Sequence, residues 1–226
     1  MNDKEKTLQD IIDCGVIAIV RVGSAQEAVE VCEAIAKGGV KSIEVTMTVP
    51  GAIDAIKEFK SAVKEEVLVG AGTVLDPQAA GAAILAGAEF IVSPILNLGV
   101  IEVCRRYSKV VIPGTLTPTE ILTAWEAGGD IIKVFPATVG GPQYLRDIKG
   151  PLPQIRLCPT GGVNLENTPD FIKAGAVAVA AGTSLVDKKA VSEKKYGIIT
   201  ENARKFVEAV KLARATKLEK GEPRHG

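Results

Sequence analysis

Histidine is nearly missing from this sequence, since its single copy, His225, lies in the C-terminal tail. A Ser-His-Asp triad, a histidine-based zinc site and histidine acid–base catalysis each require an imidazole inside a folded site. We therefore expect none of these chemistries, and we predict neither a metal ion nor any other cofactor. Catalysis, if there is any, must come from Lys, Glu, Asp, Thr, Ser or Tyr side chains.

Closely spaced cysteines, long apolar runs and an excess of one charge are missing as well. The four cysteines show no Cys-x-x-Cys spacing, which favours reduced structural thiols. Apolar runs are of strand length, well below the about 18 residues of a membrane helix, and residues 1–10 lack a signal-peptide core. Lys plus Arg and Asp plus Glu both number 27, which gives no general attraction to nucleic acid or membranes. We expect a cytoplasmic protein that acts on a small molecule.

The composition is typical of one globular unit. Of 226 residues, 46% are hydrophobic and 24% are charged, enough for one sizeable core. No linker or change of composition divides the chain. We expect a single domain spanning residues 1–226, with a polar C-terminal tail from about residue 213.

Short apolar segments alternate with helical ones along the whole chain. Eight segments are predicted strands: Val16–Val22, Ser42–Met47, Leu68–Val74, Phe90–Pro94, Val110–Thr115, Ile131–Ala137, Ile155–Gly162 and Ala176–Thr183. Strands that are apolar on both faces are typical of a parallel sheet covered by helices. Eight such units predict a single α/β domain, a (β/α)8 TIM barrel, with an extra helix near residues 4–13 and a final helix near residues 199–215.

The intervening helices carry start and stop signals. Ser24 to Glu27 and Thr117 to Glu120 have capping-box spacing, and Asp76-Pro77 is a further start signal. Four of the helices end in similar glycine motifs, centred on Gly39, Gly87, Gly128 and Gly175. This recurrence indicates repeated paired units, which supports the barrel.

Lys133 lies inside an apolar run, Ile131-Ile132-Lys133-Val134-Phe135-Pro136-Ala137. An unpaired ammonium is costly to bury, and the neutral amine that results is a nucleophile suited to Schiff-base chemistry. The alternative is a lysine at the mouth of the strand that forms an ion pair with a carboxylate such as Glu44. The position of Lys133 alone does not distinguish a nucleophilic lysine from one that forms a structural ion pair.

Strand periodicity brings a carboxylate toward this lysine. In Ser42–Met47 the apolar residues Ile43, Val45 and Met47 are expected to face the helices, so Glu44 faces the barrel interior. Lys133, flanked by Ile132 and Val134, is expected to face inward too. A nucleophile with a proton shuttle is the minimal set for imine formation, and the same two residues suffice for a structural ion pair.

Glycine-rich loops follow the last two predicted strands, Pro159-Thr160-Gly161-Gly162-Val163 and Ala181-Gly182-Thr183-Ser184. Barrels frequently bind phosphate between these loops through backbone N–H groups. We therefore predict a phosphate site made of Gly161, Gly162, Gly182 and Thr183; the alternative, glycines that only form tight turns, is less favoured because the two loops are paired. Gly70-Ala71-Gly72-Thr73 lies within a strand and lacks a third glycine, which disfavours a dinucleotide site.

Several of these segments, in order, resemble the class I aldolases for 2-keto-3-deoxy-6-phosphogluconate (KDPG) and 4-hydroxy-2-oxoglutarate (KHG). The resemblance runs from about residue 8 to 212 and rests on six motifs: Ile43–Thr46, Gly70–Val74, Ile91–Pro94, Ile112–Gly114, Lys133–Ala137 and Pro159–Val163. It implies that Lys133 is the Schiff-base lysine and that Glu44 is the general acid–base. Together, resemblance and strand-end position predict these substrate-binding residues: Arg21, Thr48, Thr73, Pro94, Thr115, Phe135 and Thr160.

The chain departs from the family pattern at two places. Many members carry an arginine four residues after the catalytic glutamate, where it helps to hold the substrate carboxylate, but here Glu44 is followed by Thr48-Val49-Pro50. Another branch of the family has this form, and Arg21 is a candidate to supply the charge instead. Thr183 stands where a serine is common, which keeps the hydroxyl.

The resemblance implies reversible aldol cleavage of KDPG to pyruvate and glyceraldehyde 3-phosphate, without a metal ion, in a homotrimer. The nearest alternatives are the same chemistry on 2-keto-3-deoxy-6-phosphogalactonate or on unphosphorylated KHG. Two remoter classes are a phosphosugar isomerase or epimerase and a non-catalytic scaffold barrel, in which Lys133 forms no imine.

Overall fold

The computed structural model describes residues 3–63 and 66–219. Within these ranges, the strands are parallel and form two sheets. The larger sheet has the order β5 (Val110–Ile112), β4 (Phe90–Val92), β3 (Leu68–Gly72), β2 (Ser42–Thr46), β1 (Val16–Val20) and β9 (Val179–Ala181). The smaller sheet has the order β6 (Gly114–Thr115), β7 (Ile132–Val134) and β8 (Leu157–Pro159).

The two sheets meet at both edges. Only Pro113 separates β5 from β6, so the predicted strand over residues 110–115 is in fact two short strands. At the other edge, isolated bridges join Leu157 to Ala176 and Thr160 to Ala180, next to β8 and β9. The strands therefore curl round rather than lie flat, and their carboxyl ends are brought to one side of the molecule.

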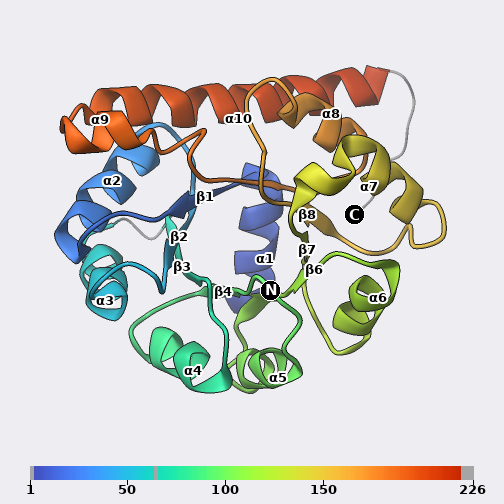
Figure 1. Cartoon of the computed structure of the whole chain (residues 1–226), viewed down its shortest axis with the longest axis horizontal. Coiled ribbons are helices and arrows are strands. Elements are labelled where there is room, and N and C mark those ends of the chain that lie inside the picture. The colour runs from blue at the N-terminus through green and yellow to red at the C-terminus, as the bar shows by residue number, and fades with distance from the viewer. Residues whose placement is uncertain (1–2, 64–65, 220–226) are drawn as a thin grey trace.

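Helices surround the strands (Figure 1). They are α1 (Asp3–Cys14), α2 (Ala25–Lys37), α3 (Ala52–Ala62), α4 (Pro77–Leu85), α5 (Leu98–Arg106), α6 (Pro118–Glu126), the 3₁₀ turn η1 (Ala137–Val139), α7 (Gly141–Lys149), α8 (Thr168–Lys173), α9 (Lys188–Ser192) and α10 (Tyr196–Glu219). Each of the long connections between neighbouring strands carries a helix, as parallel pairing requires. Among the described residues, no helix combines the length and apolarity needed to cross a membrane.

Two hydrophobic cores lie on opposite faces of the strands. The larger contains Ile43 and Val45 of β2 together with the apolar faces of the surrounding helices. The smaller fills the inside of the curl, where Ile17, Phe90 and Cys158 pack with Ile11 of α1. This alternation agrees with the periodicity of β2, and it leaves Glu44 on the inner side.

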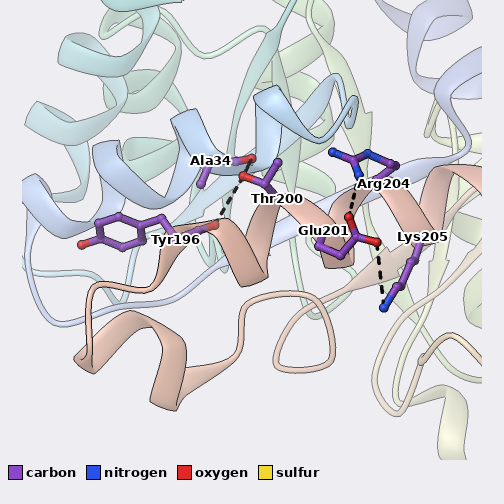
Figure 2. Close-up of polar contacts among 6 residues, drawn as sticks. All are labelled: Ala34, Tyr196, Thr200, Glu201, Arg204 and Lys205. Carbon is purple, nitrogen blue, oxygen red and sulfur yellow. Dashed lines mark hydrogen bonds and ion pairs between the residues drawn. The ribbon is translucent and has the colours of Figure 1, made fainter.

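The last helix packs against the second (Figure 2). In α10, the hydroxyl of Thr200 donates a hydrogen bond of 2.9 Å to the carbonyl oxygen of Ala34 in α2. A Cβ atom at Gly38 would lie 2.4 Å from the carbonyl oxygen of Thr200, so a glycine is needed for this close approach. Glu201 forms ion pairs with Arg204 and Lys205 farther along α10.

Element ends differ from the sequence-based expectations in specific ways. Helix α10 begins at Tyr196 and continues to Glu219, so it is longer at both ends than the final helix expected near residues 199–215. His225 lies outside the described residues. The capping box is complete at Thr117, because the side chains of Thr117 and Glu120 each accept a hydrogen bond from the other residue's backbone N–H. At Ser24 only the first of these bonds is present, from the Glu27 N–H to the Ser24 side chain.

Candidate active site

A cavity of about 810 Å³ opens at the carboxyl ends of the strands. Eleven of the thirteen residues predicted to form the site line it: Arg21, Glu44, Thr73, Pro94, Lys133, Phe135, Thr160, Gly161, Gly162, Gly182 and Thr183. They come from seven of the strands or their carboxyl ends, although they are spread over more than 160 residues of the sequence. Parallel strands produce this convergence because all of their carboxyl ends lie on the same side.

Lys133 is buried in the middle of β7, with only 6% of its surface exposed. Its backbone is held from one side by two hydrogen bonds, one from its N–H to the carbonyl of Pro113 and one from the Thr115 hydroxyl to its carbonyl. The Nζ atom lies 5.1 Å from the centre of the Phe135 ring, within the range of a cation–π contact. Among the described residues, no carboxylate forms an ion pair with Lys133.

Glu44 is even more deeply buried, at 1% exposure, and it lines the same cavity. Within the described part of the chain, its Oε2 atom has no hydrogen-bond partner. Burial raises the pKa of the Glu44 carboxyl above its usual value, and the positive charges of Lys133 and Arg21 oppose this rise. A raised pKa makes the protonated form of a carboxyl easier to reach, as a proton shuttle requires.

Space for this carboxylate depends on Gly72, at the end of the neighbouring strand β3. A Cβ atom at Gly72 would lie 2.4 Å from Oε1 of Glu44 and 2.7 Å from its Cδ. Gly72 belongs to the segment whose glycines superficially resemble a nucleotide-binding loop. Its role in this structure is to leave space for the Glu44 carboxylate.

Thr73, directly after β3, has an unusual backbone. Its φ angle is +57°, in the left-handed region that a β-branched residue rarely adopts. This conformation costs about 1–3 kcal/mol and is typical of functional sites. The Thr73 hydroxyl accepts a hydrogen bond of 3.3 Å from the guanidinium of Arg21, so that the ends of β1 and β3 are linked at the cavity.

The first glycine-rich loop is held in a strained form that only glycine tolerates well. The φ angles of Gly161 and Gly162 are +87° and +76°, and a Cβ atom at Gly162 would lie 2.2 Å from Cγ2 of Thr138. Asn167 holds the loop by donating a hydrogen bond to the Gly162 carbonyl. The Ser184 hydroxyl donates to the Val163 carbonyl and thereby ties this loop to the one after β9.

Thr160 and Cys158 extend the site inward from the end of β8. In the described chain, the buried Thr160 hydroxyl has no hydrogen-bond partner, although it lines the cavity. Burial raises the pKa of the Cys158 thiol to about 12, so this group stays neutral beside Lys133 and Glu44. Thr160 and Glu44 thus each have a buried oxygen that can form a hydrogen bond with a substrate or with water.

Two predicted residues do not line the cavity. Thr48 is exposed, and its hydroxyl lies 2.9 Å from that of Thr46. Thr115 is buried, and its hydroxyl donates a hydrogen bond to the Lys133 carbonyl, because the break at Pro113 places β6 beside β7. Thr115 therefore holds the Lys133 strand in place.

Five further polar residues line the cavity that were not among the predicted site residues: Glu27, Asn164, Ser184, Lys188 and Ser192. Ser184 and Asn164 sit within or beside the glycine motifs, so the same loops contained a signal for them. Glu27 was noticed only as a helix-capping residue, and its carboxylate accepts a hydrogen bond from the N–H of Gly23. Lys188 lies five residues beyond the last predicted strand, at the start of α9, and no local pattern marks it.

A family model described as KDPG and KHG aldolase matches residues 9–202, which is most of the chain. The chain belongs to this aldolase family. It is accordingly a carbon–carbon lyase. The "KHG/KDPG aldolase" of Escherichia coli K12 is 35% identical over 214 residues, covering 94% of this chain and all of the relative.

Solved structures agree with this assignment to the KDPG and KHG aldolases. A KDPG aldolase from Legionella pneumophila, solved with pyruvate captured as a covalent carbinolamine intermediate, is 29% identical with a TM-score of 0.80. The alignment covers 86% of this chain and 96% of that one. A chain of a cube-shaped cage designed by fusing symmetric oligomeric domains is 32% identical with a TM-score of 0.84, covering 92% of this chain and 76% of the other.

Proposed function

We propose that this aldolase cleaves 2-keto-3-deoxy-6-phosphogluconate to pyruvate and glyceraldehyde 3-phosphate through a Schiff base on Lys133. One observation carries the proposal. Lys133 is 6% exposed, forms no ion pair among the described residues, and opens into the cavity that Glu44 also lines. The absence of a direct Lys133–Glu44 ion pair disfavours a purely structural role for the two residues.

In the proposed reaction, the neutral amine of Lys133 attacks the C2 ketone and forms a carbinolamine. Loss of water gives an iminium, which accepts the electron pair released when the C3–C4 bond breaks. Glyceraldehyde 3-phosphate leaves as the C4 hydroxyl loses its proton, and an enamine of pyruvate stays on the lysine. Protonation of the enamine at C3 and hydrolysis release pyruvate and restore the amine. The iminium polarises the substrate, so no metal ion takes part.

Glu44 is the proposed acid–base group. It would protonate the departing hydroxide during iminium formation and accept the C4 hydroxyl proton during cleavage, directly or through a water. Its raised pKa, which favours the protonated form, and its free Oε2 atom support this role. The unsatisfied Thr160 hydroxyl is a second group that can bind such a water or a substrate oxygen.

The keto-acid end of the substrate is proposed to contact Arg21, Thr73, Pro94, Phe135 and Thr160. Arg21 is the candidate for binding the carboxylate, since the loop arginine of many relatives is missing here. Its hydrogen bond to Thr73 orients the guanidinium at the cavity mouth. Thr115 positions the Lys133 strand, and Thr48 has no part in this proposal.

The phosphate is proposed to bind between the loops that contain Gly161, Gly162, Gly182 and Thr183. Both loops line the cavity. Their glycines permit close approach of backbone N–H groups to a phosphate, and the Thr183 hydroxyl adds a donor without adding charge.

We further propose that the two sheets act as one closed eight-stranded barrel, in which β5 and β6 count as a single strand. The bridges beside β8 and β9 support the closure. On this proposal the chain is one domain, α1 is an extra helix before the first strand, and the protein works in the cytoplasm as a homotrimer. The designed cage built from symmetric oligomeric domains supports an oligomeric assembly.

A second substrate is favoured by one observation, the double name of the Escherichia coli relative, which includes KHG. The test is a comparison of kcat/KM for KDPG, its galactonate epimer and KHG. We expect the largest value for KDPG. A larger value for either of the others would reassign the substrate, and no cleavage of any of the three would refute the proposed function.

A further inference from the structure

A lysine outside the family motifs lies beside the proposed phosphate loops. Lys188 is the first residue of α9, five positions after Thr183, and its side chain lines the same cavity as Gly161, Gly162 and Thr183. The Lys188 side chain is exposed to water. A lysine therefore shares this cavity with two loops whose own donors are backbone N–H groups and a hydroxyl.

The charge of Lys188 is not neutralised by an ion pair. The ion pairs among the described residues include Lys189 with Glu193 and Lys195 with Glu193, but none with Lys188. The neighbouring Asp187 uses its carboxylate to cap α9, where it accepts a hydrogen bond of 2.7 Å from the N–H of Ala190. Lys188 is therefore available for an anion, and the adjacent Lys189 is not.

The other cations at the cavity are engaged elsewhere. Arg21 donates to Thr73, and Lys133 lies deep in the site against the Phe135 ring. Glu27, one of the two acidic residues in the lining, accepts a hydrogen bond from a backbone N–H in the loop after β1. Of the cations in the described lining, Lys188 alone comes from the segment that carries the second phosphate loop.

We propose that Lys188 is a specificity-determining residue whose ammonium binds the phosphate of the substrate. This inference rests on the proposed function, and it adds a cation to a site otherwise built from backbone N–H groups and a hydroxyl. A lysine on a flexible stem acts as a point charge toward phosphate. Lys188 thereby selects phosphorylated keto acids over unphosphorylated KHG.

The test replaces Lys188 with methionine, which removes the charge and keeps most of the stem. We expect kcat/KM for KDPG to fall roughly tenfold, the factor that corresponds to one weakened charge-assisted contact. The kcat/KM for KHG should stay within about twofold, since that substrate has no phosphate. Inorganic phosphate should inhibit Lys188→Met less than the wild type, and Lys188→Arg should restore most of the loss.

Lys189→Met is the matched control, because it removes a neighbouring charge that does not line the cavity. It should leave all three measurements unchanged. Equal losses for KDPG and KHG in Lys188→Met, or equal effects of the two methionine variants, would overturn the assignment of Lys188. A wild-type enzyme that cleaves no keto acid at all would instead overturn the proposed function, so the two failures can be told apart.

Discussion

Gly72→Ala is a change of one methyl group that should damage catalysis by moving Glu44. The added Cβ would lie 2.4 Å from Oε1 of Glu44. An ordinary contact between a carbon and an oxygen is about 3.3–3.6 Å, so the carboxylate must retreat by roughly 1 Å. Glu44 is 1% exposed, so the displacement must be taken up by shifts of the carboxylate and its neighbours inside the site.

The expected magnitude follows from this displacement. Overpacking of a buried site costs about 1–3 kcal/mol, which corresponds to a fall in Tm of roughly 2–12 °C for a chain of this size. A misplacement of about 1 Å in a catalytic constellation can lower the rate by about a hundredfold. We therefore expect Gly72→Ala to fold and to lose about two orders of magnitude in kcat.

The assay is steady-state cleavage of KDPG, paired with thermal unfolding followed by circular dichroism. Gly81→Ala, in α4, is the control, because a Cβ atom there meets nothing within 4 Å. That variant should keep full activity and gain about 0.5–1 kcal/mol, since alanine is the better helix former. If Gly72→Ala retained normal kcat and Tm, the account of how Glu44 is positioned would be refuted.

Two further substitutions probe the two ends of the site. Thr183→Ala should weaken transition-state binding of phosphorylated substrates by about 1.5–3 kcal/mol, the range for a hydrogen bond to a charged group. The same variant should leave proton exchange into pyruvate unchanged. Equal effects on KDPG and KHG would place the phosphate elsewhere. Because the pKa of Glu44 is raised by burial, its carboxyl contributes stability below its usual value of 4.5, and this contribution is lost as pH rises through the raised value. Glu44→Gln should therefore be increasingly more stable than the wild type as pH rises above 4.5, as measured by urea unfolding at several pH values, and a difference independent of pH would contradict the burial effect.

Much of the fold follows from local patterns. Residues such as Ile43 and Val45 alternate with polar neighbours in β2, and that alternation separates the outer core from the interior. Glycines after four helices mark turns to strands, and Gly39, Gly87, Gly128 and Gly175 all have φ between +93° and +108°. The break at Pro113 and the length of α10 depend on pairing and packing with distant segments, which local sequence does not encode.

The site is predictable where a strand end positions a residue, as at Glu44, Lys133 and Thr160. Thr115 lies outside the cavity lining because its strand pairs with β7 after Pro113, and its hydroxyl then donates to the Lys133 carbonyl. Lys188 was missed because it lies beyond the last predicted strand, at the start of α9, and only the folded chain shows that it lines the cavity. The relation between Gly72 and Glu44 is likewise a contact between neighbouring strands, and it becomes visible only in three dimensions.

The most direct measurement of the central claim is reductive trapping of pyruvate on the enzyme. Incubation with pyruvate and borohydride should attach one reduced pyruvyl group, and peptide mapping should place it on Lys133. Lys133→Arg keeps the positive charge but cannot form an imine, so it should fold, resist labelling and show no aldol cleavage. Labelling at another lysine, or near-normal turnover by Lys133→Arg, would contradict the account.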